Sequence, residues 1–118
     1  MKFASASGRW SIQDYSGGPE ELMRSLTQKV VDELPQGSLG HVKGFAEFDG
    51  GEVYVSSTLI PVEINLSTKG KFKGGAITAN IVLVFAELTA DTMQQALELG
   101  KQKVETGFDC RFVKERKR

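Results

Sequence analysis

The sequence has 118 residues, of which 40% are hydrophobic and 25% charged, as in an ordinary globular protein. Fifteen basic and fifteen acidic residues cancel, so the chain has no net field that would gather nucleic acid or an anionic membrane surface. Its single cysteine excludes an internal disulfide, and no apolar run has the length of a signal-peptide core or a membrane span. We therefore expect a cytoplasmic protein with one domain over residues 1–118, in which residues 1–8 and 114–118 are flexible.

The first half of the chain predicts a strand followed by a helix. Residues 9–15 alternate between apolar and polar, which is the period of a half-buried strand. Pro19 followed by two glutamates is typical of a helix start, because proline is tolerated at the first helical position and carboxylates favour the positive end of the helix dipole. The apolar residues then recur at helical spacing until Leu34, and Pro35 ends the helix.

A hairpin is predicted next. Alternating segments at residues 41–48 and 53–60 flank Asp49-Gly50-Gly51-Glu52, and glycine takes the positive φ that two-residue turns require. A Gly50-Gly51 turn places the small and apolar residues of both strands on one face. An Asp49-Gly50 turn would put Glu47 against Glu52, which is unfavourable. We therefore predict the Gly50-Gly51 register.

The second half predicts an edge segment, a buried strand and a second helix. After Pro61 we expect the preceding strand to kink and continue as an edge, followed by a loop over residues 67–75. Nine of the twelve residues in 77–88 are apolar at both parities, which predicts a strand covered on both faces. A helix capped at Asp91 or Thr89 should end at Gly107, before an optional strand over residues 108–113. The fold class is α+β, with an antiparallel sheet of four to five strands and two helices in the order β-α-β-β-β-α(-β), the helices on one face.

A polar hairpin face is the main candidate for a binding site. If the helices cover the apolar side of the hairpin, its other side is left to water, a ligand or another subunit. Phe45, Tyr54 and Ile60 give that side more apolar surface than an ordinary solvated face has. We predict that a homodimer or a protein partner contacts this face. Its predicted binding residues are His41, Lys43, Phe45, Glu47, Tyr54, Ser56 and Thr58.

Motifs for catalysis and cofactors are missing from the sequence. Residues 70–75 lack the spacing and the Ser/Thr of a phosphate-binding loop, and no dinucleotide fingerprint occurs. One histidine and one cysteine about seventy residues apart make no local metal site, and a Cys110–His41 nucleophile pair is neither suggested nor forbidden. We therefore expect no cofactor, no resident metal and a non-catalytic domain. A small enzyme that uses His41, Lys43 and Glu47 is a third hypothesis for the function.

Nucleic-acid binding is the alternative function. The loop at residues 69–75 holds three lysines around Phe72, which could follow a phosphate backbone and stack one base. Five more positive charges lie between residue 111 and the carboxyl end. The other interpretation is a solvated loop and a solubilising tail, which the zero net charge favours.

Three segments together resemble one known family. They are Leu34-Pro35, then His41-Val42-Lys43-Gly44-Phe45, and finally Ile81-Val82-Leu83-Val84-Phe85 running into Leu88-Thr89-Ala90-Asp91 and a helix. In this order and spacing, residues 22–99 resemble the C-terminal domain of CobW-type metallochaperone GTPases.

Lys43 and Gly44 match the family motif residue for residue, whereas His41 stands where the family usually has arginine. The family's nucleotide loop and cysteine-containing metal motif do not occur in these 118 residues. The resemblance therefore implies a module that docks on a GTPase or on a metal- or corrinoid-enzyme partner, and not one that hydrolyses GTP.

Overall fold

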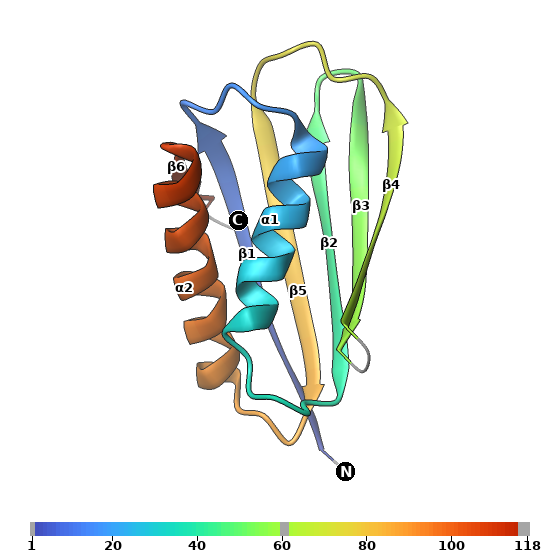
Figure 1. Ribbon diagram of the computed structural model, residues 1–118, viewed down its shortest axis with the longest axis vertical. Coiled ribbons are helices and arrows are strands. Elements are labelled where there is room, and N and C mark those ends of the chain that lie inside the picture. Colours follow the sequence, from blue (N-terminus) through green and yellow to red (C-terminus); the bar gives the residue numbers. More distant parts are fainter. Residues whose placement is uncertain (1, 60–61, 116–118) are drawn as a thin grey trace.

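The computed structural model describes residues 2–59 and 62–115, which form one antiparallel sheet with both helices on one side of it. The expected α+β class with two helices is confirmed, but the sheet has six strands and not four to five (Figure 1). The sheet order is β4-β3-β2-β5-β1-β6. The elements are β1 (Phe3–Gln13), α1 (Pro19–Asp32), β2 (Gly40–Phe48), β3 (Gly51–Leu59), β4 (Val62–Gly70), β5 (Ile77–Ala86), α2 (Ala90–Phe108) and β6 (Arg111–Lys114).

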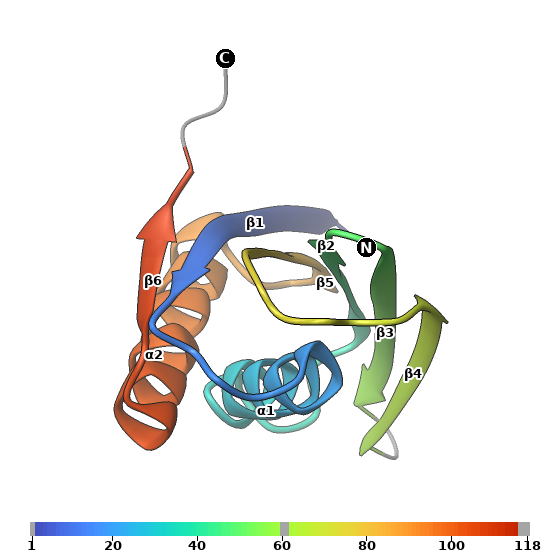
Figure 2. The ribbon, with the colours of Figure 1, turned by 90° about the horizontal axis from the view of Figure 1, so that it is seen from above.

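The core lies between the sheet and the two helices, and the sheet curves around them (Figure 2). Helix α1 packs on β2 to β5, whereas α2 packs on β1 and β6. The two helices touch where Gly100 of α2 meets Val30 of α1 so closely that a Cβ at Gly100 would lie 2.8 Å from the Val30 backbone nitrogen. Glycine at this position therefore sets the distance between the helices.

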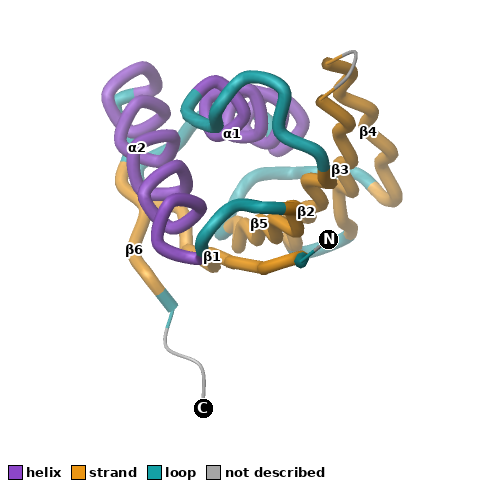
Figure 3. The backbone as a smooth tube through the Cα atoms, turned by 90° about the horizontal axis from the view of Figure 1, so that it is seen from below, coloured by secondary structure: helices purple, strands orange, loops and turns teal. Residues whose placement is uncertain are grey.

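Strand β5 is central, as expected, but it is covered on one face only. Its odd-numbered residues are buried against the helices, with Leu83 and Phe85 fully inaccessible. The even-numbered residues point to the other side, where Val82 is 40% exposed. Figure 3 shows why, since both helices lie on the same side of the strands. The expectation of cover on both faces was wrong, because apolar residues at both parities do not require a second layer.

The hairpin of β2 and β3 has the register that the sequence argument rejected. Phe48 pairs with Gly51, so the turn is Asp49-Gly50, with φ of 99° at Gly50. Glu47 does stand opposite Glu52, but Glu47 lies 3.8 Å from the Arg9 guanidinium and Glu52 stands opposite Lys69 on β4. Nearby cations thus offset the repulsion that decided the prediction. Since the error is two residues, every side chain keeps its predicted face.

Strand β4 was predicted as an edge continuation of the preceding strand, and it is an edge, but it is a strand of its own. Leu59 pairs with Val62, and β4 runs antiparallel to β3. The expected kinked continuation of the same strand was therefore wrong. Pro61 and Ile60 themselves lie outside the described residues. β4 runs on to Gly70, which shortens the expected loop.

The ends of several elements also differ from expectation. β1 begins at Phe3 and pairs with β5 along its length, so residues 3–8 belong to the sheet, although they were expected to be flexible. Helix α2 is capped by Thr89, whose hydroxyl accepts from the Thr92 N–H at 3.1 Å, and not by Asp91. The optional last strand exists as β6, paired with β1. Residues 116–118 of the expected flexible tail lie outside the described residues.

Candidate functional site

The face of the sheet that carries no helix, called here the open face, holds all the binding residues that the sequence predicts. They occupy alternate positions of β2 and β3, while the residues between them, such as Val42 and Val53, are buried under the helices. The set is His41, Lys43, Phe45, Glu47, Tyr54, Ser56 and Thr58. Ile60, expected beside His41, is not among the described residues.

An aromatic pair lies near the middle of the open face. Phe45 and Tyr54 are directly opposite each other on β2 and β3, and their rings stack with centroids 5.9 Å apart and planes at 25°. Tyr54 is 44% exposed. A hydrogen bond to Glu52 raises the pKa of the Tyr54 phenol, and the charge of the same carboxylate adds to the effect. The pair therefore presents apolar ring surface with its one hydroxyl already engaged.

A hollow of about 460 Å³ adjoins this pair. Its floor is the sheet itself, from β5 across β2 and β3 to the edge strand β4. The side chains around it are mainly apolar or uncharged, with one cation, and include Lys43, Phe45, Tyr54, Asn65, Ser67 and Val82. Such a surface suits an apolar side chain of a partner better than a charged ligand.

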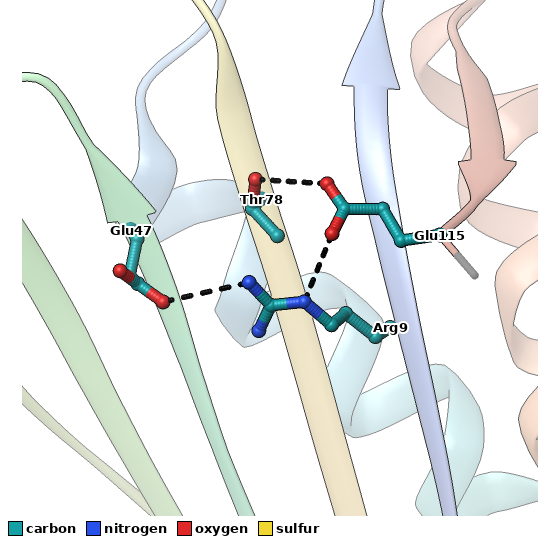
Figure 4. A network of polar contacts seen from close by, with 4 residues as sticks. All are labelled: Arg9, Glu47, Thr78 and Glu115. Atoms are coloured by element: carbon teal, nitrogen blue, oxygen red, sulfur yellow. Dashed lines mark hydrogen bonds and ion pairs between the residues drawn. The ribbon is translucent and has the colours of Figure 1, made fainter. Parts of the chain in front are cut away.

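A polar network borders the hollow on the side of β1 (Figure 4). Arg9 of β1 binds Glu115 through Nε at 2.9 Å and approaches Glu47 through Nη2 at 3.8 Å. Thr78 of β5 donates to the other Glu115 oxygen at 3.5 Å. Asn80, with its amide turned to satisfy its contacts, accepts from Arg9 Nη1 at 2.8 Å. The network joins β1, β2, β5 and the segment after β6, and it fixes the Arg9 guanidinium over the sheet.

The three residues of the small-enzyme hypothesis do not meet at one site. His41, Lys43 and Glu47 lie along one strand, and six residues of extended chain separate His41 from Glu47 by about 20 Å. Glu47 is also drawn toward Arg9. General acid–base chemistry needs its groups within hydrogen-bonding reach of one substrate, and this arrangement does not supply that.

Cys110 and His41 lie in different parts of the molecule. Cys110 is buried just before β6, whereas His41 is on β2, two strands further across the sheet than β1. Burial raises the pKa of the Cys110 thiol, and the nearby Glu105 adds to this. The thiol is thus held neutral and is not an activated nucleophile. Among the residues that the structure describes, no three His, Cys, Asp or Glu side chains cluster as a metal site.

The residues of the predicted nucleic-acid site are far apart or already bound to other side chains. Phe72 is partly buried and packs edge-on against Phe48, with centroids 5.3 Å apart, so its ring is not presented for stacking. Lys69 lies on β4 and Arg111 on β6, at opposite edges of the sheet. Arg111 is bound to Asp14 and Gln13. Four acidic residues, Glu47, Glu52, Glu63 and Glu115, share the open face with its basic residues, so it is no electropositive platform.

Several residues of the open face escaped the sequence argument. Val82 and Asn80 were assigned to a strand covered on both sides, and Arg9 was treated only as a polar position of the first strand. A signal was present in β5, where Thr78 and Asn80 are polar at alternating positions. Glu115 could not be found in this way, because only tertiary structure brings it to Arg9, 106 residues away.

The sequence matches no protein-family model and no curated protein. The backbone is similar to part of the crystal structure of the zinc-bound YjiA GTPase from E. coli, with a TM-score of 0.46 and 13% identity over 81% of this chain. A zinc-bound triple mutant of that GTPase gives a TM-score of 0.47 at the same identity and coverage. The chain spans 29% of the length of either protein. YjiA is a CobW-family GTPase, and the similarity is one of structure alone. Neither helix in the described part of the chain is long and apolar enough to cross a membrane.

Proposed function

We propose that this chain is a non-catalytic binding domain that contacts another protein through its open face. The observation that carries the proposal is the apolar centre of that face, where Phe45, Tyr54 and Val82 line one hollow. Tyr54 and Val82 are each at least 40% exposed, and Phe3 and Val113, which are also exposed, lie at open-face positions nearer its ends. Scattered exposed apolar residues are ordinary, but a shared face with a stacked aromatic centre is typical of an interface.

The border of this surface supports the same function. Lys43 and Glu47 flank Phe45 along β2, and the Arg9 network closes the side toward β6. An apolar centre with a charged rim has the composition of a protein–protein contact. Fixed charges at the rim contribute mainly to the choice and orientation of the partner.

The partner class follows from the sequence resemblance. We propose a GTPase, or a metal- or corrinoid-handling enzyme, as the protein on which the domain docks. Within the matched Lys-Gly pair, a Cβ at Gly44 would lie 2.6 Å from the Asn80 carbonyl oxygen and 2.7 Å from Ile81, so packing explains the glycine. Lys43 projects to the open face at the hollow and is the matched residue that a partner would meet. A single buried, free thiol fits a reducing compartment such as the cytoplasm.

The test compares two truncations on opposite sides of the molecule. Binding to an immobilised full-length CobW-type GTPase, and to a corrinoid-binding enzyme, is measured by biolayer interferometry. We expect Phe45→Ala/Tyr54→Ala to raise Kd by about tenfold or more, because aromatic residues at the centre of an interface dominate affinity. Leu99→Ala is the control, since Leu99 is 45% exposed but lies on α2, behind the sheet. Thermal melting of each variant measures the loss of monomer stability, which should be smaller than the loss of binding.

Equal affinities for the wild type and the double variant would place the contact elsewhere. No binding of the wild type to either enzyme would contradict the proposed partner class. Association with a generic oligonucleotide at low salt, lost on adding salt, would favour the alternative function instead.

A further inference from the structure

We infer that the β4 edge is a self-association surface, on which β4 of a second copy pairs antiparallel and continues the sheet. This surface is distinct from the open face and does not depend on the proposed function. β4 lies at one end of the strand order, and no described segment of the chain lies beyond it (Figures 1 and 2). A free edge presents a row of unpaired N–H and C=O groups that can template another strand.

The middle of β4 lacks the usual protection of an edge. Proteins blunt free edges with short strands, charged side chains, a proline or a bulge. β4 is nine residues long and regularly paired to β3, and its middle, residues 64–67, is uncharged. Its charges are Glu63 near the start and Lys69 near the end. Val62 is 50% exposed at the same edge. The other edge strand, β6, has only four residues.

Charge complementarity selects a second copy as the occupant. A two-fold axis perpendicular to the sheet keeps each face on its own side, so open-face residues must stand opposite open-face residues. With the axis at Leu66, Glu63 stands opposite Lys69 of the second copy, and this pair occurs twice. Asn65 then stands opposite Ser67 of the second copy. A shift of the axis by one residue in either direction removes both Glu63–Lys69 pairs.

Neither charged residue is held in an ion pair within its own copy, although Lys69 stands opposite Glu52 of the same chain. Glu63 and Lys69 form no ion pair with another residue of the described chain. On the helix side of the same edge, Val62 and Ile64 border a hollow of about 510 Å³ beside α1, which a second copy would partly close. The pairing leaves the open faces of both copies on one side, side by side, where each can still contact a partner.

The experiment is a charge-swap series read by sedimentation velocity over a wide range of concentrations, up to millimolar. The wild type should form a dimer. Glu63→Lys and Lys69→Glu each replace two attractive pairs with two repulsive ones, and each should raise the dimer Kd by about tenfold or more. The swap Glu63→Lys/Lys69→Glu should restore the wild-type Kd. A mixture of the two single variants should form a heterodimer, because every opposed pair is then of opposite sign.

Two controls separate this contact from others. Asp32→Lys makes the same change of charge at the end of α1 and should leave the dimer Kd unchanged. Phe45→Ala/Tyr54→Ala should also leave it unchanged, since those residues lie on the open face. A monomeric wild type at millimolar concentration overturns the inference. So does a dimer that persists in both single swaps, or one that the Phe45→Ala/Tyr54→Ala pair abolishes.

Discussion

Two neighbouring residues of β5 provide a sharp test of the one-sided sheet. Leu83 is fully buried on the helix side, whereas Val82 points to the open face and is 40% exposed. Truncating each to alanine removes apolar volume from the same central strand. If the helices cover one face only, the two variants must differ strongly in the free energy of unfolding.

The magnitude for Leu83→Ala follows from its surroundings. Its strand neighbours are Ala6 on β1 and Val42 on β2, both buried, so the site has little freedom to collapse around a cavity. We expect a loss of about 2 to 5 kcal/mol. For a domain of this size, such a loss lowers Tm by about 10 °C or more. Val82→Ala should cost no more than about 1 kcal/mol, from partial burial and lower strand propensity.

The assay is urea unfolding of both variants and the wild type, followed by circular dichroism, with the m-value as a check on two-state behaviour. Equal losses for Val82→Ala and Leu83→Ala would mean that a second layer covers the open face. A loss below about 1 kcal/mol for Leu83→Ala would contradict its place in the core. In either case the assignment of the open face would be wrong.

Three further predictions concern single positions under and beside the helices. Thr27→Val should raise the free energy of unfolding by about 1 kcal/mol, seen as a higher Tm, because the buried Thr27 hydroxyl has no hydrogen-bond partner in the described part of the chain and valine keeps its shape. Gly100→Ala should lower the free energy of unfolding by about 1 to 2 kcal/mol in the same assay, since contact with the Val30 backbone outweighs the gain in helix propensity. A stabilised variant would refute the close approach of the two helices. Burial raises the pKa of Tyr15 to about 12, and the charge of Glu21 adds to the effect. The neutral Tyr15 phenol therefore contributes stability below pH 10, and this contribution is lost as pH rises from 10 to about 12. Tyr15→Phe should therefore flatten the fall of Tm over that interval, and an unchanged slope would contradict the assignment.

Local patterns in the sequence were enough to find most of the elements. Both helices, the hairpin and the central strand are confirmed because helical and strand periods in the apolar residues act over short distances. The seven predicted binding residues share one face, since alternation along a strand determines the side of every residue. That result survived an error in register, because a shift of two residues preserves parity.

Tertiary structure decided what local patterns leave open. Glu47 stands opposite Glu52 with Arg9 of β1 near the first carboxylate and Lys69 of β4 opposite the second, and neither cation is local in sequence. β4 is a separate strand because it pairs with β3, a choice between continuation and reversal that alternation does not encode.

Which face of the sheet is open depends on where the helices pack. An apolar run such as that of β5 has the same sequence pattern whether one face of the strand is covered or both. The sequence by itself therefore determined which side chains lie together along each strand. Only long-range pairing and helix placement determined which strands are neighbours, which edge is free and which face carries no helix, because these depend on contacts between residues far apart in the chain.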